Sequence, residues 1–297
     1  MTAAEFYVFL PQMRMTFDGI VVRAQTAEAS GFRGMAFMDH LVPPGAEQHP
    51  MQEAFSIATV VAMKTERLRV GHLVLCDSFR HPVMLARQAL DVDHLSGGRF
   101  DLGIGSGSVP AEFEPFGMPV RSGPERVRRL GETLQVLEAL WSGEPVDFDG
   151  EFHHLASAAI APRPLDRIPI LIGGSGPRTM ELVARHADWW NLPVHQLSRL
   201  QEMRSRAGTA RVSVQQMVAF VGDESRRESV TELARRRFPG YGAGLVIGDG
   251  DQLVAHFSGL AEQGVERYYI WFADFAAEET LQQFGARVIS AFSAVVH

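Results

Sequence analysis

Two glycine-rich segments offer backbone groups that could bind phosphate. Residues 103–108 read Gly-Ile-Gly-Ser-Gly-Ser, and residues 172–176 read Ile-Gly-Gly-Ser-Gly and run into Pro177 and Arg178. Because glycine allows positive φ and close approach, successive N–H groups of such a loop can converge on an anion. Pro177 suits the first turn of a helix, whose N-terminus adds further free N–H groups. The segments predict one long phosphate-bearing cofactor or two anionic ligands, although the first also fits a simple turn out of a strand.

Asp39 and His40 form a second candidate site. They follow an apolar run at residues 34–38 and precede a loop that contains Pro43 and Pro44. An imidazole can give or take a proton near neutral pH, and a neighbouring carboxylate can orient it. The same residues also fit an Asx-type turn with a surface histidine. Residue types alone leave the catalytic and the turn interpretations open.

The elements that must position these residues alternate between strands and helices. Strands are predicted at residues 6–10, 34–38, 68–75, 99–104, 168–172, 188–191, 212–220 and 267–271. Helices are predicted between them from apolar residues at helical spacing, including 17–27, 53–63, one opening at 81–82 and one from 278 to the end. About eight such units favour a closed (β/α)8 TIM barrel over an open sheet.

The alternation is interrupted between residues 109 and 167. A long amphipathic helix is predicted at 125–141, and Asp149-Gly150 marks a hairpin in the run that follows it. We therefore expect one domain over residues 1–297, with an insertion at about 109–167 after the fourth strand.

Composition narrows the class of protein. The chain has 28 Lys and Arg against 35 Asp and Glu, and its basic residues form no cationic stripe, so no nucleic acid partner is expected. No apolar run approaches the length of a membrane span. The single cysteine, Cys76, excludes an internal disulfide and a thiolate metal cluster, and the histidines lack metal-ligand spacing. These features predict a cytoplasmic protein with no metal and no membrane contact.

The order and spacing of several motifs resemble the bacterial luciferase-like monooxygenase superfamily. The motifs are Asp39-His40, Arg80-His-Pro82, the glycine segments with Glu112-Phe113 after the first, and Ala187-Asp-Trp189. Within the superfamily the chain most resembles the oxidoreductases that use the deazaflavin coenzyme F420. The resemblance is close over about residues 5–195 and implies a TIM barrel with its cofactor at the C-terminal ends of the strands.

The resemblance implies roles for particular residues. His40 would lie beside the reactive carbon and act as proton donor or acceptor, with Asp39 orienting it. Leu73 and Val74 match a strand bulge that holds a non-prolyl cis peptide behind the ring, and Cys76 would line the ring pocket or simply pack. The cofactor-binding candidates are Asp39, Leu73, Val74, Cys76, Gly105, Ser106, Gly107, Ser108, Gly173, Gly174, Ser175, Gly176 and Arg178.

Two departures bear on the reaction. Sugar-phosphate dehydrogenases of this family carry a glutamate after the first glycine segment and a tryptophan after the Asp-His pair, where this chain has Ser108 and Pro44. The resemblance therefore implies hydride transfer between F420 and another small organic substrate, in an enzyme that we expect to be a homodimer. The alternative is an FMN-dependent monooxygenase that takes reduced flavin from a separate flavin reductase and uses oxygen. A non-catalytic sugar- or phosphate-binding protein is a third possibility.

Overall fold

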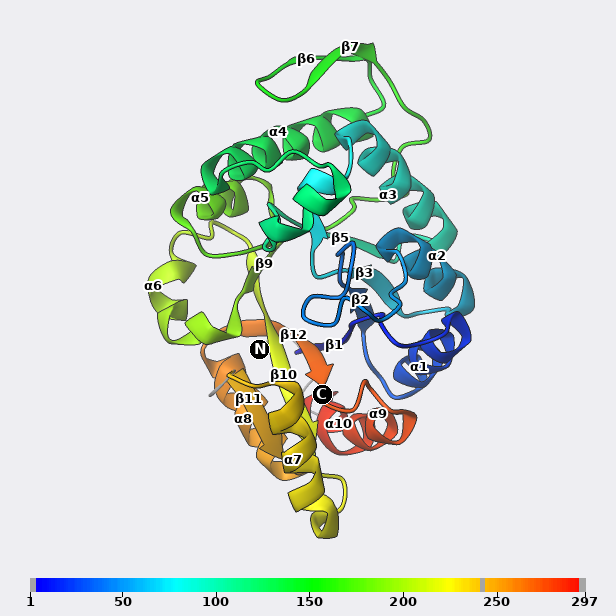
Figure 1. The fold of residues 1–297 in the computed structure, drawn as a ribbon, viewed down its shortest axis with the longest axis vertical. Helices are drawn as coiled ribbons and strands as arrows, with labels where there is room; N and C mark the ends of the chain where they lie inside the picture. Colours follow the sequence, from blue (N-terminus) through cyan, green and yellow to red (C-terminus); the bar gives the residue numbers. More distant parts are fainter. Residues whose placement is uncertain (1–3, 241–243, 294–297) are drawn as a thin grey trace.

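The computed structural model describes residues 4–240 and 244–293. Within them, eight parallel strands close into a barrel ringed by helices (Figure 1). The strand β10 closes the ring because it pairs with β9 on one side and with β12 on the other. The barrel strands are β1 (Glu5–Leu10), β2 (Gly34–Phe37), β3 (Arg69–His72), β5 (Phe100–Gly105), β8 (Ile170–Gly173), β9 (Trp189–Leu192), β10 (Arg211–Phe220) and β12 (Val265–Phe272). The predicted TIM barrel is confirmed.

Helices cover the outside of the barrel. They are α1 (Phe17–Ala29), α2 (Ala54–Lys64), α3 (Pro82–Ser96), α4 (Gly123–Trp141), α5 (Pro177–His186), α6 (Leu200–Arg204), α7 (Arg227–Arg237), α8 (Gly250–Glu262), α9 (Glu278–Phe284) and α10 (Ser290–Ser293). Local sequence fixes several ends: Ser122 and Glu125 form a capping box at α4, and Gly97, with a φ of 65°, ends α3. Among the described residues, every helix is too short or too polar to cross a bilayer.

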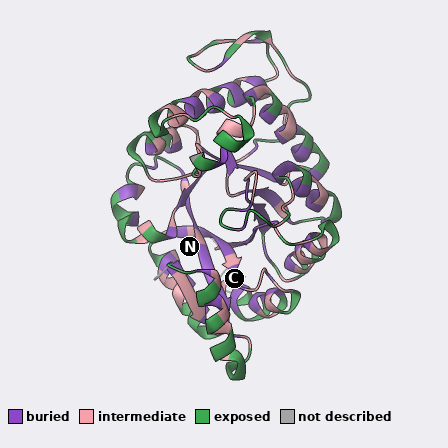
Figure 2. Ribbon diagram, in the orientation of Figure 1, coloured by how far each residue is buried: buried purple, intermediate pink, exposed green. Residues whose placement is uncertain are grey.

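The core lies between the barrel and this ring of helices. All six residues of β5 are buried, as expected for a parallel strand that is covered on both faces. Figure 2 shows buried residues along the strands and on the inward sides of the helices, with exposed residues on the outer sides. The apolar residues of the predicted strands and helices therefore pack against one another between the barrel and the helices.

The segment expected as one insertion contains a regular helix of the ring. Helix α4 packs between α3 and α5, so it serves as the helix of the fourth strand–helix unit. The additional elements are shorter than the expected 109–167. They are the 3-10 turns η2 (Pro110–Glu112) and η3 (Glu114–Phe116) before α4, and the hairpin of β6 (Val146–Asp149) and β7 (His154–Ala158) after it.

The third predicted strand is divided in the structure. Residues 68–75 were expected to be continuous, but β3 stops at His72 and a two-residue strand, β4 (Leu75–Cys76), pairs with β5 farther on. The sequence analysis also missed β11 (Leu245–Gly248), which pairs with β10 outside the barrel ring. The last helix is α9, a π-helical turn (Gly285–Ile289) and α10, and residues 294–297 lie outside the described residues.

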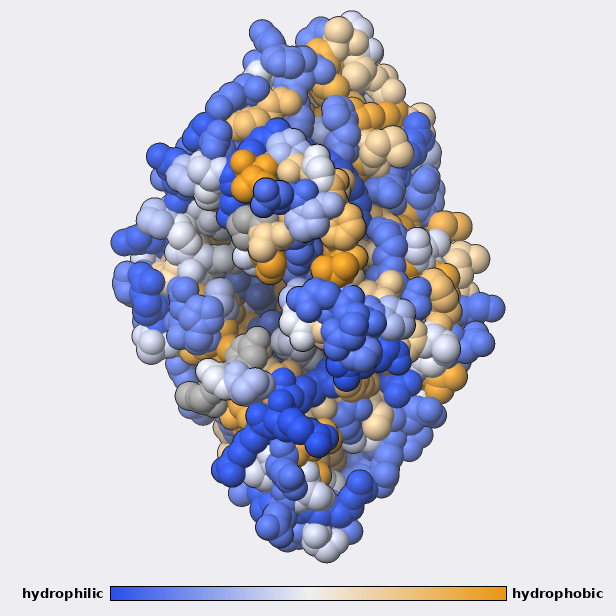
Figure 3. Space-filling view, in the orientation of Figure 1, coloured by the Kyte–Doolittle hydropathy of each residue, from blue (hydrophilic) through white to orange (hydrophobic). Residues whose placement is uncertain are grey.

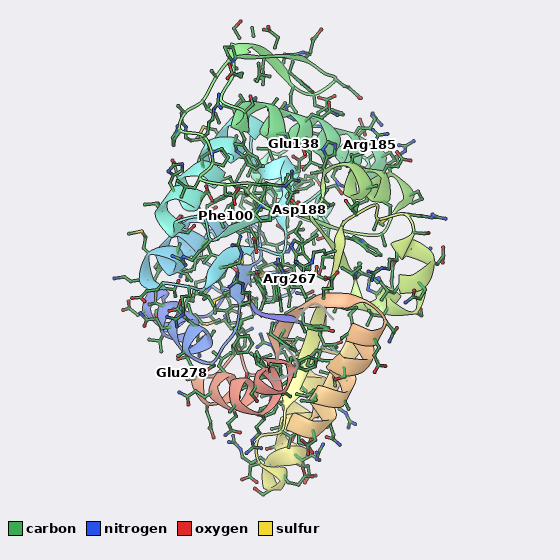
Figure 4. All side chains as sticks on the ribbon, turned by 180° about the vertical axis from the view of Figure 1, so that it is seen from behind. Phe100, Glu138, Arg185, Asp188, Arg267 and Glu278 are labelled. Carbon is green, nitrogen blue, oxygen red and sulfur yellow. The ribbon has the colours of Figure 1, made fainter. Side chains whose placement is uncertain are left out.

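A buried network of charges fills the N-terminal end of the barrel. Asp101 of β5 accepts hydrogen bonds from Tyr7, Arg69 and Arg267, which come from β1, β3 and β12. The guanidinium carbon of Arg267 also lies 3.7 Å from the ring centre of Trp189. Figure 4, seen from behind, shows Arg267 in the middle of the ring. This end of the barrel is closed, which leaves the opposite end for a site.

Candidate active site

A cavity of about 350 Å³ lies at the C-terminal ends of β2, β4, β5 and β8. It gathers most of the residues that the sequence analysis selected: Asp39, His40, Leu73, Val74, Cys76, Gly105, Ser106, Gly107, Ser108, Gly173 and Gly174. Ser175, Gly176 and Arg178 do not line it; they lie just beyond, at the start of α5. Strand ends and loops far apart in the sequence therefore meet around one space.

His40 is paired with a carboxylate that the sequence analysis did not select. Its Nδ1 lies 2.6 Å from Oε1 of Glu112, and the other carboxylate oxygen accepts a hydrogen bond from the backbone N–H of Leu41 at 3.1 Å. The Glu112 side chain is 5% exposed, whereas that of His40 is 21% exposed. With Nδ1–H donating to Glu112, the Nε2 of His40 carries the lone pair and has no hydrogen-bond partner among the described residues.

Asp39 was expected to orient His40, but in the structure it binds other groups. Its carboxylate accepts two hydrogen bonds from Arg80, at 2.6 and 3.0 Å, and one from the backbone N–H of Cys76 at 2.8 Å. Arg80 in turn donates to Glu53 at 2.8 Å. Asp39 therefore ties the end of β2 to β4, the wall of the cavity, and Glu112 takes the place beside the imidazole.

The wall between β3 and β4 carries the bulge that the resemblance implied. The Leu73–Val74 peptide bond is cis, and both residues line the cavity. Glycines are required opposite this wall, because a Cβ on Gly105 would lie 2.8 Å from Cγ2 of Val74. A Cβ on Gly107, which has a φ of 88°, would lie 3.0 Å from the Cys76 sulfur. The absence of side chains on these glycines leaves room beside Val74.

The second glycine segment leads into the N-terminus of α5. Gly174 has a φ of 128°, and its carbonyl accepts a hydrogen bond from the indole of Trp190 at 2.7 Å. Gly176 is the N-cap of α5 and supplies no side-chain hydrogen bond, and Pro177 follows it. The next backbone N–H groups of the first turn are therefore available to an anion at the edge of the cavity.

Cys76 and His72 are not reactive groups here. Burial raises the pKa of the Cys76 thiol to about 12, so the thiol stays protonated and packs in the cavity wall. Burial lowers the pKa of His72 to about 4, and its Nε2 lies 3.2 Å from the carbonyl of Ala54. His72 is a packed strand residue, as the sequence analysis expected.

Several side chains of the site were not selected from the sequence. Glu112 and Phe113 stood in a quoted motif without a role, and Arg80 stood in another. Thr179, in the first turn of α5, lines the cavity instead of Arg178. Glu112, four residues beyond Ser108, could be seen in the sequence as an acid. Its spacing did not indicate that η2 would turn its carboxylate toward His40.

The chain is similar to proteins of one known family. The family model for luciferase-like monooxygenases matches residues 2–273. The F420-dependent glucose-6-phosphate dehydrogenase of Nakamurella multipartita is 34% identical over 166 residues, which are 56% of this chain and 49% of the relative. The F420-dependent hydroxymycolic acid dehydrogenase of Mycobacterium tuberculosis is 28% identical over 242 residues, 77% of this chain and 66% of the relative. The chain thus spans about half the length of the first of these curated relatives.

Solved structures share the fold. An F420-dependent secondary alcohol dehydrogenase, in complex with an F420-acetone adduct, superposes with a TM-score of 0.80 at 18% identity, covering 96% of this chain and 98% of its own. The long-chain alkane monooxygenase LadA superposes with a TM-score of 0.83 at 16% identity, covering 99% and 92%. From the extent of the family match, this chain belongs to the luciferase-like monooxygenase family.

Proposed function

We propose that this protein is an F420-dependent oxidoreductase that transfers a hydride between the deazaflavin C5 and a small organic substrate. The observation that carries the proposal is the pair of His40 and Glu112 in the cavity, 2.6 Å apart, beside the Leu73–Val74 wall. Relatives at 34% and 28% identity are named for F420-dependent dehydrogenation of a sugar phosphate and of a hydroxymycolic acid. Their names support the cofactor, and their differing substrates leave the substrate of this chain open.

The residues present fit a deazaflavin. The cavity of about 350 Å³ has an apolar wall at Leu73 and Val74, against which a flat ring can pack, and the bare glycines 105 and 107 keep the opposite side open. The first turn of α5 offers backbone N–H groups for a phosphate at the edge of the cavity, next to Gly173 and Gly174. The N–H of Gly174 itself donates to the carbonyl of Asn191 at 3.2 Å. Asp39 lines the cavity, but its carboxylate is bound to Arg80 and so supports the wall.

In this mechanism the protein handles the proton. Bound F420 supplies a hydride acceptor, or in its reduced form a hydride donor, at C5. When an alcohol is oxidised, the carbon loses a hydride and the hydroxyl loses a proton, and Nε2 of His40 accepts that proton. Glu112 holds Nδ1 and balances the positive charge that forms on the ring. In the direction of carbonyl reduction, the same Nε2 returns the proton to the oxygen.

Cofactor binding distinguishes this proposal from its alternatives. We expect the purified protein to quench the fluorescence of F420 on titration and to bind FMN at least about tenfold more weakly. Preferential binding of FMN would instead indicate a monooxygenase that depends on a separate flavin reductase. Binding of neither would rule out both flavin-type functions.

Substitution of His40 tests the proton step. We expect His40→Ala to keep its F420 affinity within about tenfold while turnover falls by roughly two to four orders of magnitude, the range for loss of a general acid or base. His49→Ala is the matched control, because His49 lies in the loop after β2 and does not line the cavity. Unchanged turnover in His40→Ala would remove this residue from the mechanism.

A further inference from the structure

Two arginines lie at the open end of the barrel, away from the His40 cavity. Arg14 is in the loop after β1, and Arg237 is the last residue of α7. The guanidinium carbon of Arg237 lies 3.1 Å from the ring centre of Phe275, in the loop after β12. Since β1 and β12 are neighbours in the barrel, all three residues belong to the same side of the rim.

Arg237 forms no ion pair among the described residues. Its guanidinium makes no hydrogen bond to them either, and its Nε is buried without a partner. Asp274, the acid whose charge acts on Arg237, uses its carboxylate to accept hydrogen bonds from Thr280 at 2.6 Å and from the N–H of Ala277. Burial lowers the pKa of Arg237 to about 10; Asp274 raises it and Arg14 lowers it. Arg237 is half-buried, and a cation in such a position is stabilised by a bound anion.

The backbone around the two arginines is strained. Arg14, Phe275 and Ala276 have φ values of 61°, 63° and 56°, in the left-handed region that residues other than glycine rarely adopt. They are three of the four such residues in the described chain, and the fourth, Ser157, is in the distant β6–β7 hairpin. Strained residues of this kind cluster at ligand sites, where the strain holds side chains in place.

A series of apolar packing contacts runs from the cavity wall to the residue next to Arg237. Leu73 and Val74 of the cavity wall pack against the same buried cluster as Met13, Met51 and Trp271. The Trp271 ring then packs edge-on against Phe238, the residue after Arg237, with ring centres 5.0 Å apart. Figure 3 shows hydrophilic surface over the end of α7 that faces the middle of the molecule. Apolar side chains in contact with one another thus lead from Leu73 and Val74 to Phe238, beside the cationic Arg237.

We propose that Arg14 and Arg237 bind an oxyanion, a carboxylate or a phosphate ester, at one end of a substrate whose apolar part lies along Met13, Met51 and Trp271. This substrate class rests on the proposed function, because it places the other end of the substrate at His40 and the ring. Arginine forks suit both anions, and Phe275 holds the Arg237 fork in one plane.

The test uses eight-carbon probes on the protein without cofactor, so that it is independent of F420 binding. We expect octanoate and octyl phosphate to bind at least about tenfold more tightly than octanol by calorimetry, as for one charge-assisted pair. Tighter binding of octyl phosphate than of octanoate identifies a phosphate ester as the natural group, and the reverse identifies a carboxylate. Equal binding of octanol and both anions overturns the proposal.

Variants locate the anion. We expect Arg237→Gln to remove the preference for the anionic probes, Arg14→Gln to reduce it, and Arg237→Lys to retain part of it. Arg235→Gln is the control, because Arg235 is an exposed arginine on the same helix and its loss changes the net charge equally. If Arg235→Gln loses as much as Arg237→Gln, or if Arg237→Gln keeps the preference with an unchanged melting temperature, the site is not at Arg237.

Discussion

At the scale of single residues, Glu112 gives His40 one defined orientation. The imidazole is partly exposed, and without a partner on Nδ1 it would sample both tautomers and several rotamers. The carboxylate fixes Nδ1 as the donor and leaves Nε2 for the substrate. Glu112 is itself held by the N–H of Leu41, so its second oxygen is also committed. The pair is therefore a positioned base of the kind that proton transfer requires.

Replacing Glu112 tests this positioning role. We expect Glu112→Gln to lower turnover by about tenfold to a hundredfold and to alter its pH profile, because the amide can still bond to Nδ1 but cannot balance a charged imidazole. The affinity for F420 should stay within about threefold. Steady-state kinetics across pH 5 to 9 provide the measurement. The control is Glu114→Gln, an exposed acid two residues away, for which unchanged kinetics are expected.

At the scale of elements, the η2–η3 segment brings Glu112 to the site. Phe113 separates the two 3-10 turns, is 1% exposed, and packs edge-on against Phe79 with ring centres 5.7 Å apart. Gly117, with a φ of 66°, ends η3 and returns the chain toward α4. One buried aromatic ring thus anchors a segment that otherwise lies on the surface, and with it the carboxylate of Glu112.

Removing that ring should separate the role of the segment from that of the barrel. We expect Phe113→Ala to reduce turnover as far as Glu112→Gln does and to cost about 3 kcal/mol in the free energy of unfolding, as for a buried phenylalanine. Urea unfolding and steady-state kinetics measure the two effects. Phe116→Ala removes a ring that is 51% exposed and should change neither quantity. Full activity in Phe113→Ala would show that Glu112 is positioned by other contacts.

At the scale of the whole molecule, the two ends of the barrel differ. One end is filled by a buried ionic network, and the other is open and carries the candidate site. Asp101, Arg69 and Arg267 form a buried ionic network at the N-terminal end. Burial raises the pKa of Asp101, but the two arginine partners outweigh it and hold the pKa below its usual range. The C-terminal end carries the cavity and the Arg14–Arg237 pair. This division is general for TIM barrels.

Acid should weaken the whole barrel in a defined range. The pKa of His72 is about 4 in the folded chain and 6.5 in the unfolded chain, so between these values the unfolded state binds more protons. The free energy of unfolding should therefore fall as the pH drops from 6.5 to 4, by up to about 3 kcal/mol from this residue. Urea unfolding of His72→Leu should show a shallower pH slope. His154→Leu, at an exposed histidine, should keep the slope of the unaltered protein.

The sequence predicted the barrel because each strand is a short apolar run between turn residues. Each of the eight runs overlaps a barrel strand, and the predicted helix starts at Pro82 and near Glu125 correspond to α3 and α4. The missed β11 and the divided third strand have a common reason. Local apolar pattern does not reveal which neighbour a strand pairs with or where a bulge interrupts it. The insertion was expected to be wider because the η2–η3 segment separates α4 from β5, the strand that it follows, and a hairpin comes after it.

What the sequence by itself determined is the set of residues that can do chemistry: the Asp-His pair, the two glycine segments and the strands that precede them. These follow from local rules, since glycine, proline and apolar periodicity act on neighbouring residues. Only the tertiary structure decided the partners, because contact between positions 40 and 112, 39 and 80, or 237 and 275 depends on how the barrel closes. For that reason Asp39 was identified from the sequence as a site residue but given the wrong partner, and Glu112 and Arg237 acquired roles only in the fold.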